Sequence, residues 1–325
     1  MNSSYVLRLM WLCFASFFLV HTALGMVAAA SAPLVGRLAE GMRARSAARL
    51  LLGARLAPAF LAMAAVLGLC VPSYLWFEPQ TGGERVGIAC FAAALLGGLA
   101  WATAFVRVFR GIARSRRYAR RRGGMDGAPG IYGEPSPVSV VEETRPVLLL
   151  CGIFRSRIII SRSILSALPA EQLDAALRHE QAHRASRDNF KRLLMLLSPG
   201  LVPFSRGFAA LERSWEKAAE WAADDAATAG DEVRAVSLAA ALVRVARMGV
   251  NPDPPLVASL TAGGRGLEAR VDRLLRPQPL PAQPGRSIRT AVGAAVLASG
   301  CAVAAVFLAP AALSSIHRLL EVLLR

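Results

Sequence analysis

The chain has 325 residues, a formal net charge of +16 and a mean hydropathy of +0.43, and 54% of its residues are hydrophobic. This composition is too apolar for an ordinary soluble enzyme and indicates membrane spans. The five cysteines include no pair at CxxC spacing, so they predict neither a disulfide framework nor a cysteine zinc site.

Four apolar stretches are long enough to cross a membrane, which takes about 20 mostly apolar residues. The core of each stretch has almost no charge, as the cost of a buried charge requires. A cleaved signal peptide is an alternative for the first stretch, because small residues stand at its end, at 28–31. The arginines that follow it favour a true span with an outward N-terminus. The predicted spans are residues 9–30, 56–77, 86–109 and 290–313.

The basic residues predict the orientation of the chain. Eight arginines lie between Arg107 and Arg122 with no acid among them, and cytoplasmic loops carry such an excess. The only charged residues near the loop between the second and third spans are Glu78, Glu84 and Arg85, so we expect this loop outside. The long segment before the fourth span is then cytoplasmic. Because the basic run directly follows a span, we expect it to contact anionic lipid headgroups of the bilayer, and we expect no direct nucleic-acid partner.

The cytoplasmic segment reads as a mixture of strands and helices. After a Gly- and Pro-rich linker at 123–137, short β-branched or apolar runs predict strands. The apolar run 193–204 is interrupted by serine, glycine and two prolines, so we expect a buried or membrane-skimming segment and not a span. Strands are predicted at 138–141, 147–150 and 157–160, and helices after Pro169 and at 208–229, 233–247 and 267–275.

The motif that indicates a chemical function is HEQAH, which contains His179, Glu180 and His183. The whole chain has only four histidines, and two of them lie in this motif. On a helix, residues at i and i+4 share one face, so the two imidazoles can chelate one metal ion. Glu180 projects about 100° around the same helix, where its carboxylate can take a proton from a water activated by the ion. The motif predicts a zinc peptidase; the alternative is an amphipathic helix that carries two histidines by chance.

A third zinc ligand is needed, because catalytic zinc keeps three protein ligands and one open position. The remaining histidines, His21 and His317, lie in or beside apolar segments, so the third ligand must be a carboxylate or a lone thiol. Three acids lie along one face of the helix predicted at 208–229, and spacing alone does not choose among them. They could also form a solvated face. These acids are Glu212, Glu216 and Glu220.

Four segments resemble the BlaR/MecR-type membrane metallopeptidases, a gluzincin family of bacterial antirepressors. In this family the Glu of a Glu-x-x-x-Asp element after HExxH is the third zinc ligand, and here that pattern falls on Glu220 and Asp224. The resemblance thus implies that His179, His183 and Glu220 hold Zn²⁺ and that Glu180 is the catalytic base. The segments are GIFRSRIIISRSIL (152–165), AALRHEQAHRASRDNFKRLL (175–194), EWAADDAA (220–227) and, weakly, LEARVDRLL (267–275).

Zinc-bound imidazoles usually donate their other N–H to a carboxylate or carbonyl, which makes Asp224 and Asp188 candidates to orient the histidines. The expected fold is an α-helical membrane protein with four transmembrane helices and a cytoplasmic α+β zincin-like metallopeptidase domain between the third and fourth. Its expected domains are residues 1–122 with three spans, 123–287 with the zinc metallopeptidase, and 288–325 with the fourth span and a short outer tail.

The resemblance implies a signal-transducing protease of the bacterial inner membrane that cleaves a winged-helix transcriptional repressor, itself, or both. Family members that sense β-lactams carry a penicillin-binding domain after the fourth span, where this sequence has only residues 314–325. A signal is therefore expected through the spans, an outer loop or a separate sensor protein.

Two alternatives stay open. The first is a housekeeping membrane protease of the HtpX or CaaX-prenyl-protease type, although three spans before HEQAH and one after it count against this reading. The second is a non-catalytic membrane transducer that retains the metal site. A scaffold would not need the base, so the presence of Glu180 argues against a transducer.

Overall fold

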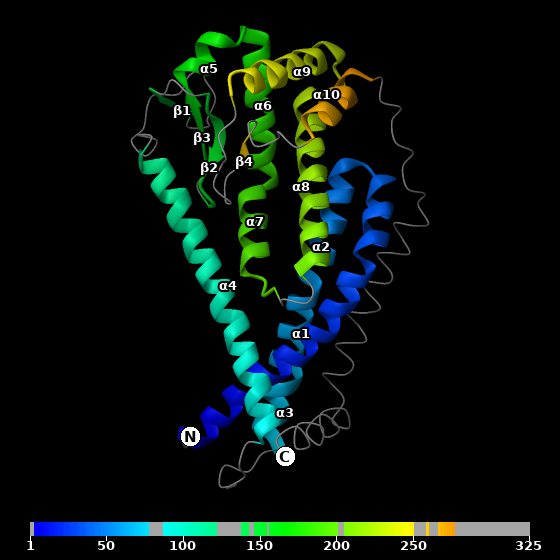
Figure 1. The fold of residues 1–325 in the computed structure, drawn as a ribbon, viewed down its shortest axis with the longest axis vertical. Coiled ribbons are helices and arrows are strands. Elements are labelled where there is room, and N and C mark those ends of the chain that lie inside the picture. The colour runs from blue at the N-terminus through cyan, green and yellow to red at the C-terminus, as the bar shows by residue number, and fades with distance from the viewer. Residues whose placement is uncertain are drawn as a thin grey trace.

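The computed structural model describes residues 3–77, 87–121, 138–142, 146–154, 156–200, 205–249, 258–259 and 266–276. Long apolar helices form one end of the molecule, and a small sheet with shorter helices forms the other (Figure 1). The helix that carries HEQAH lies in the second part, and the helix that follows it extends toward the first part.

Among the described residues, three helical stretches are long and apolar enough to cross a membrane: Tyr5–Glu40, Ala44–Phe77 and Ile88–Arg117. They agree with the first three predicted spans and indicate a multi-pass membrane protein. The fourth predicted span, 290–313, lies outside the described residues. The helices concerned are α1 (Ser3–Glu40), α2 (Ala44–Ala65) with the π-helical turn η1 (Val66–Cys70) and α3 (Val71–Phe77), and α4 (Ile88–Arg121).

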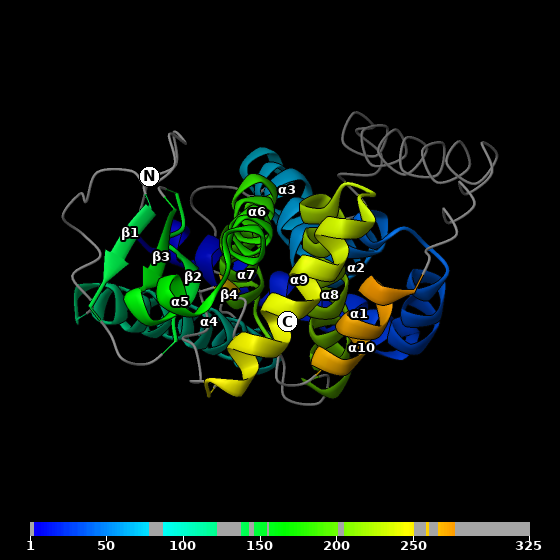
Figure 2. The same ribbon diagram turned by 90° about the horizontal axis from the view of Figure 1, so that it is seen from above.

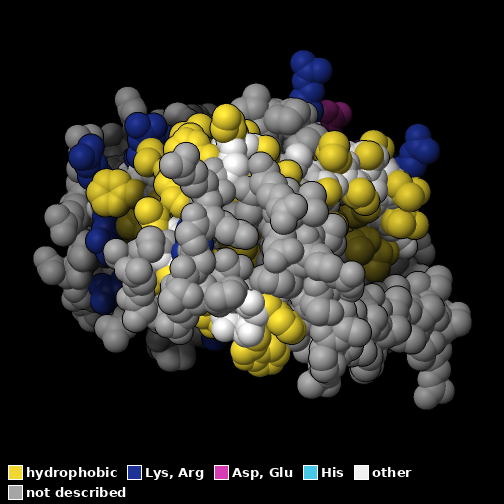
Figure 3. Space-filling model, turned by 90° about the horizontal axis from the view of Figure 1, so that it is seen from below, with side chains coloured by type: hydrophobic (Ala, Val, Ile, Leu, Met, Phe, Trp, Pro, Cys, Tyr) yellow, Lys and Arg dark blue, Asp and Glu magenta, His cyan; other side chains and the backbone are white. Residues whose placement is uncertain are grey.

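The surfaces of these helices suit a lipid environment. Large apolar side chains point outward, and Phe60, Leu99 and Phe109 are 72%, 60% and 74% exposed. Viewed from the end remote from HEQAH, the described side chains are mostly apolar, with basic ones toward the margin (Figure 3). The helices meet through small residues: a Cβ added to Gly97 of α4 would lie 2.4 Å from the carbonyl oxygen of Phe14 in α1. Such close approach is typical of helix packing in membranes.

A small mixed sheet opens the second part. Its strand order is β1-β3-β2-β4, with β1 parallel to β3 and with β2 antiparallel to both β3 and β4. The first three strands match the predicted ones to within one residue. The two-residue β4 was not predicted, because so short a segment carries no periodic signal. The strands are β1 (Val138–Val141), β2 (Leu148–Cys151), β3 (Arg157–Ser161) and β4 (Ala258–Ser259).

In the part of the chain that the structure describes, six helices accompany the sheet. The apolar core lies between the strands and helices α6 and α9. Pro169 precedes α6, where a missing N–H costs nothing. Arg187 adopts a left-handed conformation, with φ 56°, and separates α6 from α7. The sequence reading did not predict this break. The helices are α5 (Arg162–Ala167), α6 (Ala170–Ser186), α7 (Asp188–Leu197), α8 (Ser205–Thr228), α9 (Glu232–Arg247) and α10 (Leu267–Leu275).

Helices α7 and α8 reach down among the membrane helices (Figure 1). α8 packs against α1 and α2, and α7 packs against α4. The end of α7 belongs to the apolar run 193–204, in which Met195, Ser198 and Pro199 are buried. Residues 201–204 of this run lie outside the described residues. Seen from above, α6 and α8 lie between the sheet on one side and α10 on the other (Figure 2).

Candidate metal centre

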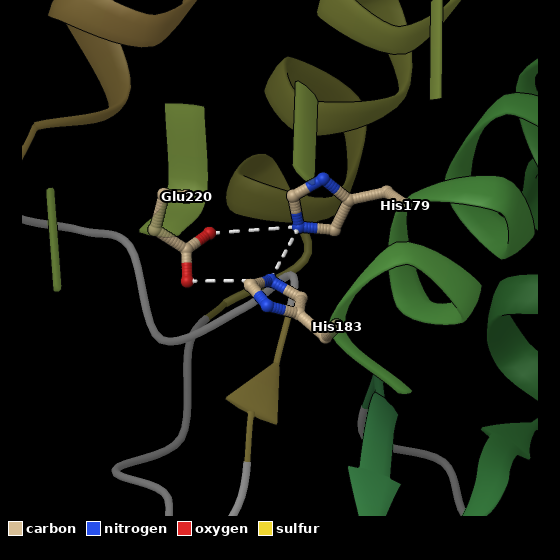
Figure 4. Close-up of side chains that lie close together, drawn as sticks. All are labelled: His179, His183 and Glu220. Carbon is tan, nitrogen blue, oxygen red and sulfur yellow. Dashed lines mark hydrogen bonds and ion pairs between the residues drawn. The ribbon is translucent and has the colours of Figure 1, made fainter. Parts of the chain in front are cut away.

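Three side chains from two helices meet at one point. His179 and His183 lie one turn apart on α6, and Glu220 reaches them from α8 (Figure 4). The two Nε2 atoms are 3.1 Å apart, and each lies 3.5 Å from a different oxygen of Glu220. Among the residues that the structure describes, this is the one group of three whose donor atoms could hold a metal ion.

The donor triangle has the size that a zinc ion needs. Nitrogen and oxygen ligands lie about 2.0–2.1 Å from zinc, so a tetrahedral arrangement places them about 3.3 Å from each other. The observed separations of 3.1, 3.5 and 3.5 Å bracket that value. Both imidazoles are fully buried, and the Glu220 side chain is 16% exposed. The donor set of two imidazoles and one carboxylate is one that catalytic zinc uses.

A carboxylate holds the other nitrogen of each imidazole. His183 Nδ1 lies 2.7 Å from Asp188 Oδ2, and His179 Nδ1 lies 3.0 Å from Asp224 Oδ1. An ionised carboxylate only accepts hydrogen bonds, so His183 Nδ1 is the donor to Asp188, whereas His179 Nδ1 lies at an ion-pair distance from Asp224 without a hydrogen bond. With one proton on each Nδ1, both Nε2 lone pairs would point into the donor triangle. The structure thus places Asp188 and Asp224 beside the imidazoles that they were predicted to orient.

Arg270 completes the group from α10. It donates from Nε and Nη2 to the two oxygens of Asp224, at 2.9 and 2.7 Å, and its Nη1 lies 3.0 Å from Glu220 Oε2. Its Nη2 is also 3.4 Å from His179 Nε2. One buried guanidinium therefore touches both acids of the Glu-x-x-x-Asp element and one histidine.

The acids dominate the electrostatics of this group. Burial lowers the pKa of both imidazoles, but the surrounding carboxylates outweigh it, so the pKa of His179 is raised and that of His183 is raised to about 10. Burial raises the pKa of Glu220 and Asp224, but the imidazoles and Arg270 outweigh it, and both pKa values are lowered. The potential at the two Nε2 atoms therefore attracts a positive ion.

Charge balance indicates what that ion can be. Four carboxylates, of Glu180, Asp188, Glu220 and Asp224, surround the imidazoles and face two cations, Arg270 and Lys191. With neutral imidazoles the formal charge is −2, which one divalent cation offsets. Two protons would also offset it, but then two N–H groups would face each other across 3.1 Å. The arrangement fits a zinc ion better than a pair of imidazolium groups.

Glu180 lies beside the donor triangle and is not one of its corners. Its side chain is fully buried on α6. It is close enough to raise the pKa of both His183 and Arg270 by its charge. A buried carboxylate in this place is suited to exchange protons with a molecule bound in front of the imidazoles.

The structure separates the three acids among which spacing did not choose. Glu220 meets the imidazoles, Glu216 is exposed, and Glu212 receives a hydrogen bond from Arg55 at 2.7 Å. The thiol of Cys151 does not join the group either; it lies 4.0 Å from the Ser115 carbonyl oxygen.

Sequence reasoning missed two residues of this region. Arg270 lies in the weakly matching segment 267–275, and nothing in the sequence distinguishes it from the other basic residues there. Asn189 donates to the carbonyl oxygens of Leu150 and Gly152, both at 2.9 Å, and so ties the start of α7 to the end of β2. Its position next to Asp188 was the only available signal.

Comparison of the chain with models of known protein families finds no match, and comparison with curated proteins finds none either. The molecule is a mostly helical protein with three candidate membrane spans and a buried His179/His183/Glu220 group that could hold a metal ion.

Proposed function

We propose that this chain is a membrane-integrated zinc endopeptidase of the BlaR/MecR type, with His179, His183 and Glu220 as the zinc ligands. The observation that carries the proposal is the buried donor triangle, in which the Nδ1 of each imidazole faces its own carboxylate. A scaffold would need neither the oriented lone pairs nor a buried carboxylate beside them.

When bound, zinc would act as a Lewis acid that makes a water more acidic and polarises the substrate carbonyl. Glu180 takes the proton of the attacking water and delivers it to the leaving amide nitrogen, which is general base and then general acid catalysis. Asp188 and Asp224 keep the imidazoles in the tautomer with the proton on Nδ1. Arg270 holds Glu220 and Asp224 in place through three contacts of 2.7–3.0 Å.

The substrate that we propose is a cytoplasmic winged-helix repressor, the chain itself, or both. Support comes from the segments that resemble the antirepressor family and from the arginines between Arg107 and Arg122, which favour a centre on the cytoplasmic side. The signal would arrive through the spans, an outer loop or a separate sensor protein in the bacterial inner membrane.

The test compares zinc content and peptide-bond cleavage in protein purified into nanodiscs, with candidate repressors and the chain itself as substrates. Glu180→Gln should keep stoichiometric zinc and lose at least about 100-fold in cleavage rate, as expected for loss of a general base. Glu220→Ala should lose both. Glu216→Gln is the matched control, because Glu216 is exposed on the same helix, and it should behave as wild type.

Wild-type protein without stoichiometric zinc would refute the proposal and leave a non-catalytic transducer. Cleavage of unfolded membrane proteins in the absence of any inducing signal, with repressors left intact, would indicate an HtpX-like housekeeping protease instead.

A further inference from the structure

Each of the three described spans directs one polar side chain to the same turn, residues 198–200 at the end of α7. From α1, His21 Nε2 lies 3.0 Å from the Pro199 carbonyl oxygen. From α2, Arg55 Nη1 donates to Ser198 Oγ at 2.9 Å. From α4, Arg107 Nη2 donates to the Ser198 carbonyl oxygen at 3.2 Å.

Arg55 also contacts the second helix of this region. Its Nε donates to Glu212 Oε1 of α8 at 2.7 Å, while its Nη2 donates to the Met195 carbonyl oxygen of α7 at 3.3 Å. The guanidinium lies over the ring of Phe208, 4.5 Å from its centroid, and Arg55 is 2% exposed. One side chain of a membrane helix therefore joins α7 to α8.

Ionisable groups at membrane depth are costly and usually mark function. Arg55 immediately precedes the predicted span 56–77, and Arg107 lies within the predicted span 86–109. A topological role explains why basic residues border these spans. It does not explain why Arg55 is buried and shared between α7 and α8.

The two helices that Arg55 joins, α7 and α8, both reach the metal centre, and we call them its two arms. α7 begins with Asp188, which lies against His183 of the preceding α6. α8 carries Glu220, eight residues or about 12 Å along the helix from Glu212. Helices transmit displacement along their length, so a change in the separation of α7 and α8 at Arg55 would move Asp188 relative to Glu220.

We propose that Arg55 is a positioning residue that sets the separation of α7 and α8. The geometry of the metal centre then depends on how the membrane helices are arranged. The inference rests on the proposed function of His179, His183 and Glu220 as zinc ligands. A shift of α2 relative to α1 and α4 then changes zinc affinity and cleavage without any contact between a span and the zinc ligands. This supplies the residue-level connection through which a signal in the spans reaches the site.

The experiment measures two quantities in nanodiscs: zinc affinity by competition with a chelator, and arm separation by the distance between spin labels. One label is placed at Ala185→Cys, at the end of α6 three residues before α7 begins, and the other at Glu216→Cys of α8. Both positions are exposed, the native cysteines are replaced, and the label distance reports where α7 begins relative to α8. We expect Arg55→Gln to weaken zinc binding at least about tenfold, the lower end of what supporting residues of metal sites contribute, and to broaden or shift the label distance. Arg49→Gln, exposed on the same α2, is the matched control and should change neither.

Two further variants keep the test valid if Arg55→Gln does not fold. Glu212→Gln weakens the contact to α8, and Ser198→Ala removes one contact to α7. Each should produce part of the effect, and Arg55→Lys should recover only part, because an ammonium cannot reproduce the forked contacts of a guanidinium. If Arg55→Gln also folds, combining it with Glu212→Gln should add little, since the two substitutions remove the same contact.

The outcomes separate this inference from the proposed function. A wild-type protein without zinc would refute the zinc centre, and the label distances would still test Arg55. Wild-type zinc affinity and an unchanged distance in Arg55→Gln, or in both single-contact variants, would overturn the positioning role. A lowered melting temperature with unchanged zinc affinity and distance would show that Arg55 serves stability alone.

Discussion

Two buried polar clusters both include residues of α7 and α8, and they differ in charge. At the metal centre, four carboxylates face Arg270 and Lys191. At the turn 198–200 the excess is reversed: Arg55 and Arg107 face Glu212, and carbonyl oxygens and a serine hydroxyl accept their remaining hydrogen bonds.

This difference in charge indicates which cluster needs a bound ion. The guanidinium groups at the turn donate to oxygens of the chain itself, although Arg107 Nε has no hydrogen-bond partner among the described residues. With neutral imidazoles the metal centre has a formal charge of −2 and two Nε2 lone pairs directed at one point, so a divalent cation would complete it. Helices α7 and α8 thus contribute to both clusters, of which one is suited to structure and the other, completed by α6 and α10, is suited to chemistry.

The largest expected effect is on the free energy of unfolding, and it comes from removing Arg270, the cation that contacts both Glu220 and Asp224. Arg270→Met leaves Asp224 and Glu220 without their guanidinium, and breaking a buried pair costs about 3–5 kcal/mol in the free energy of unfolding. Denaturant unfolding of metal-depleted protein in detergent measures it. Arg273→Met is the control one turn along α10, because its partner Asp225 is 48% exposed. Equal losses from both variants would contradict the central role of Arg270.

Neutralising the orienting acids should have a smaller effect, confined to the metal. We expect Asp188→Asn and Asp224→Asn each to weaken zinc binding about 10–100-fold, since an amide no longer holds the Nδ1 proton as strongly. Chelator competition measures the affinity, with Asp225→Asn as the control from the same helix as Asp224. If either variant bound zinc as wild type does, the corresponding imidazole would not depend on its carboxylate.

The loss of stability with rising pH should disappear when zinc is added. In metal-depleted protein the pKa of His183 is about 10, against an ordinary value of 6.5. The stability from its extra proton is complete below about pH 6.5 and is lost as the pH rises through 10. Zinc needs the unprotonated imidazole, so stabilisation by zinc grows as the pH rises over the same range. Melting temperatures at pH 6.5–10, with and without zinc, test this, and parallel curves would contradict it.

Local patterns were sufficient for the elements that carry the site. Apolar length marked the first three spans, β-branched runs marked β1 to β3, and the spacing of His179 and His183 placed both on one face of α6. The choice of Glu220 came from a resemblance, because Glu212, Glu216 and Glu220 are equivalent in spacing. Only the packing of α8 against α6 and α2 distinguishes them.

Interactions between distant segments could not be predicted in the same way. Arg55 was interpreted as one of several arginines that set topology, yet its partner Glu212 lies 157 residues further along the chain. Arg270 reaches Asp224 across 46 residues, from a short helix whose sequence indicates only amphipathicity. A single basic residue carries no signal of its partner, so both contacts required the fold.

The smallest expected effect concerns the residue next to the first histidine. Arg178 precedes His179 on α6 but lies on its outer side, where it pairs with Asp174 at 2.7 Å and is 48% exposed. Exposed pairs one helical turn apart contribute about 0.3–0.5 kcal/mol, because solvent screens both charges. Arg178→Ala should therefore change the free energy of unfolding by less than about 1 kcal/mol and leave zinc affinity unchanged, as unfolding and chelator competition would show. A loss of zinc in this variant would mean that the face of α6 opposite the imidazoles also supports the metal centre, which the burial of His179 and His183 does not predict.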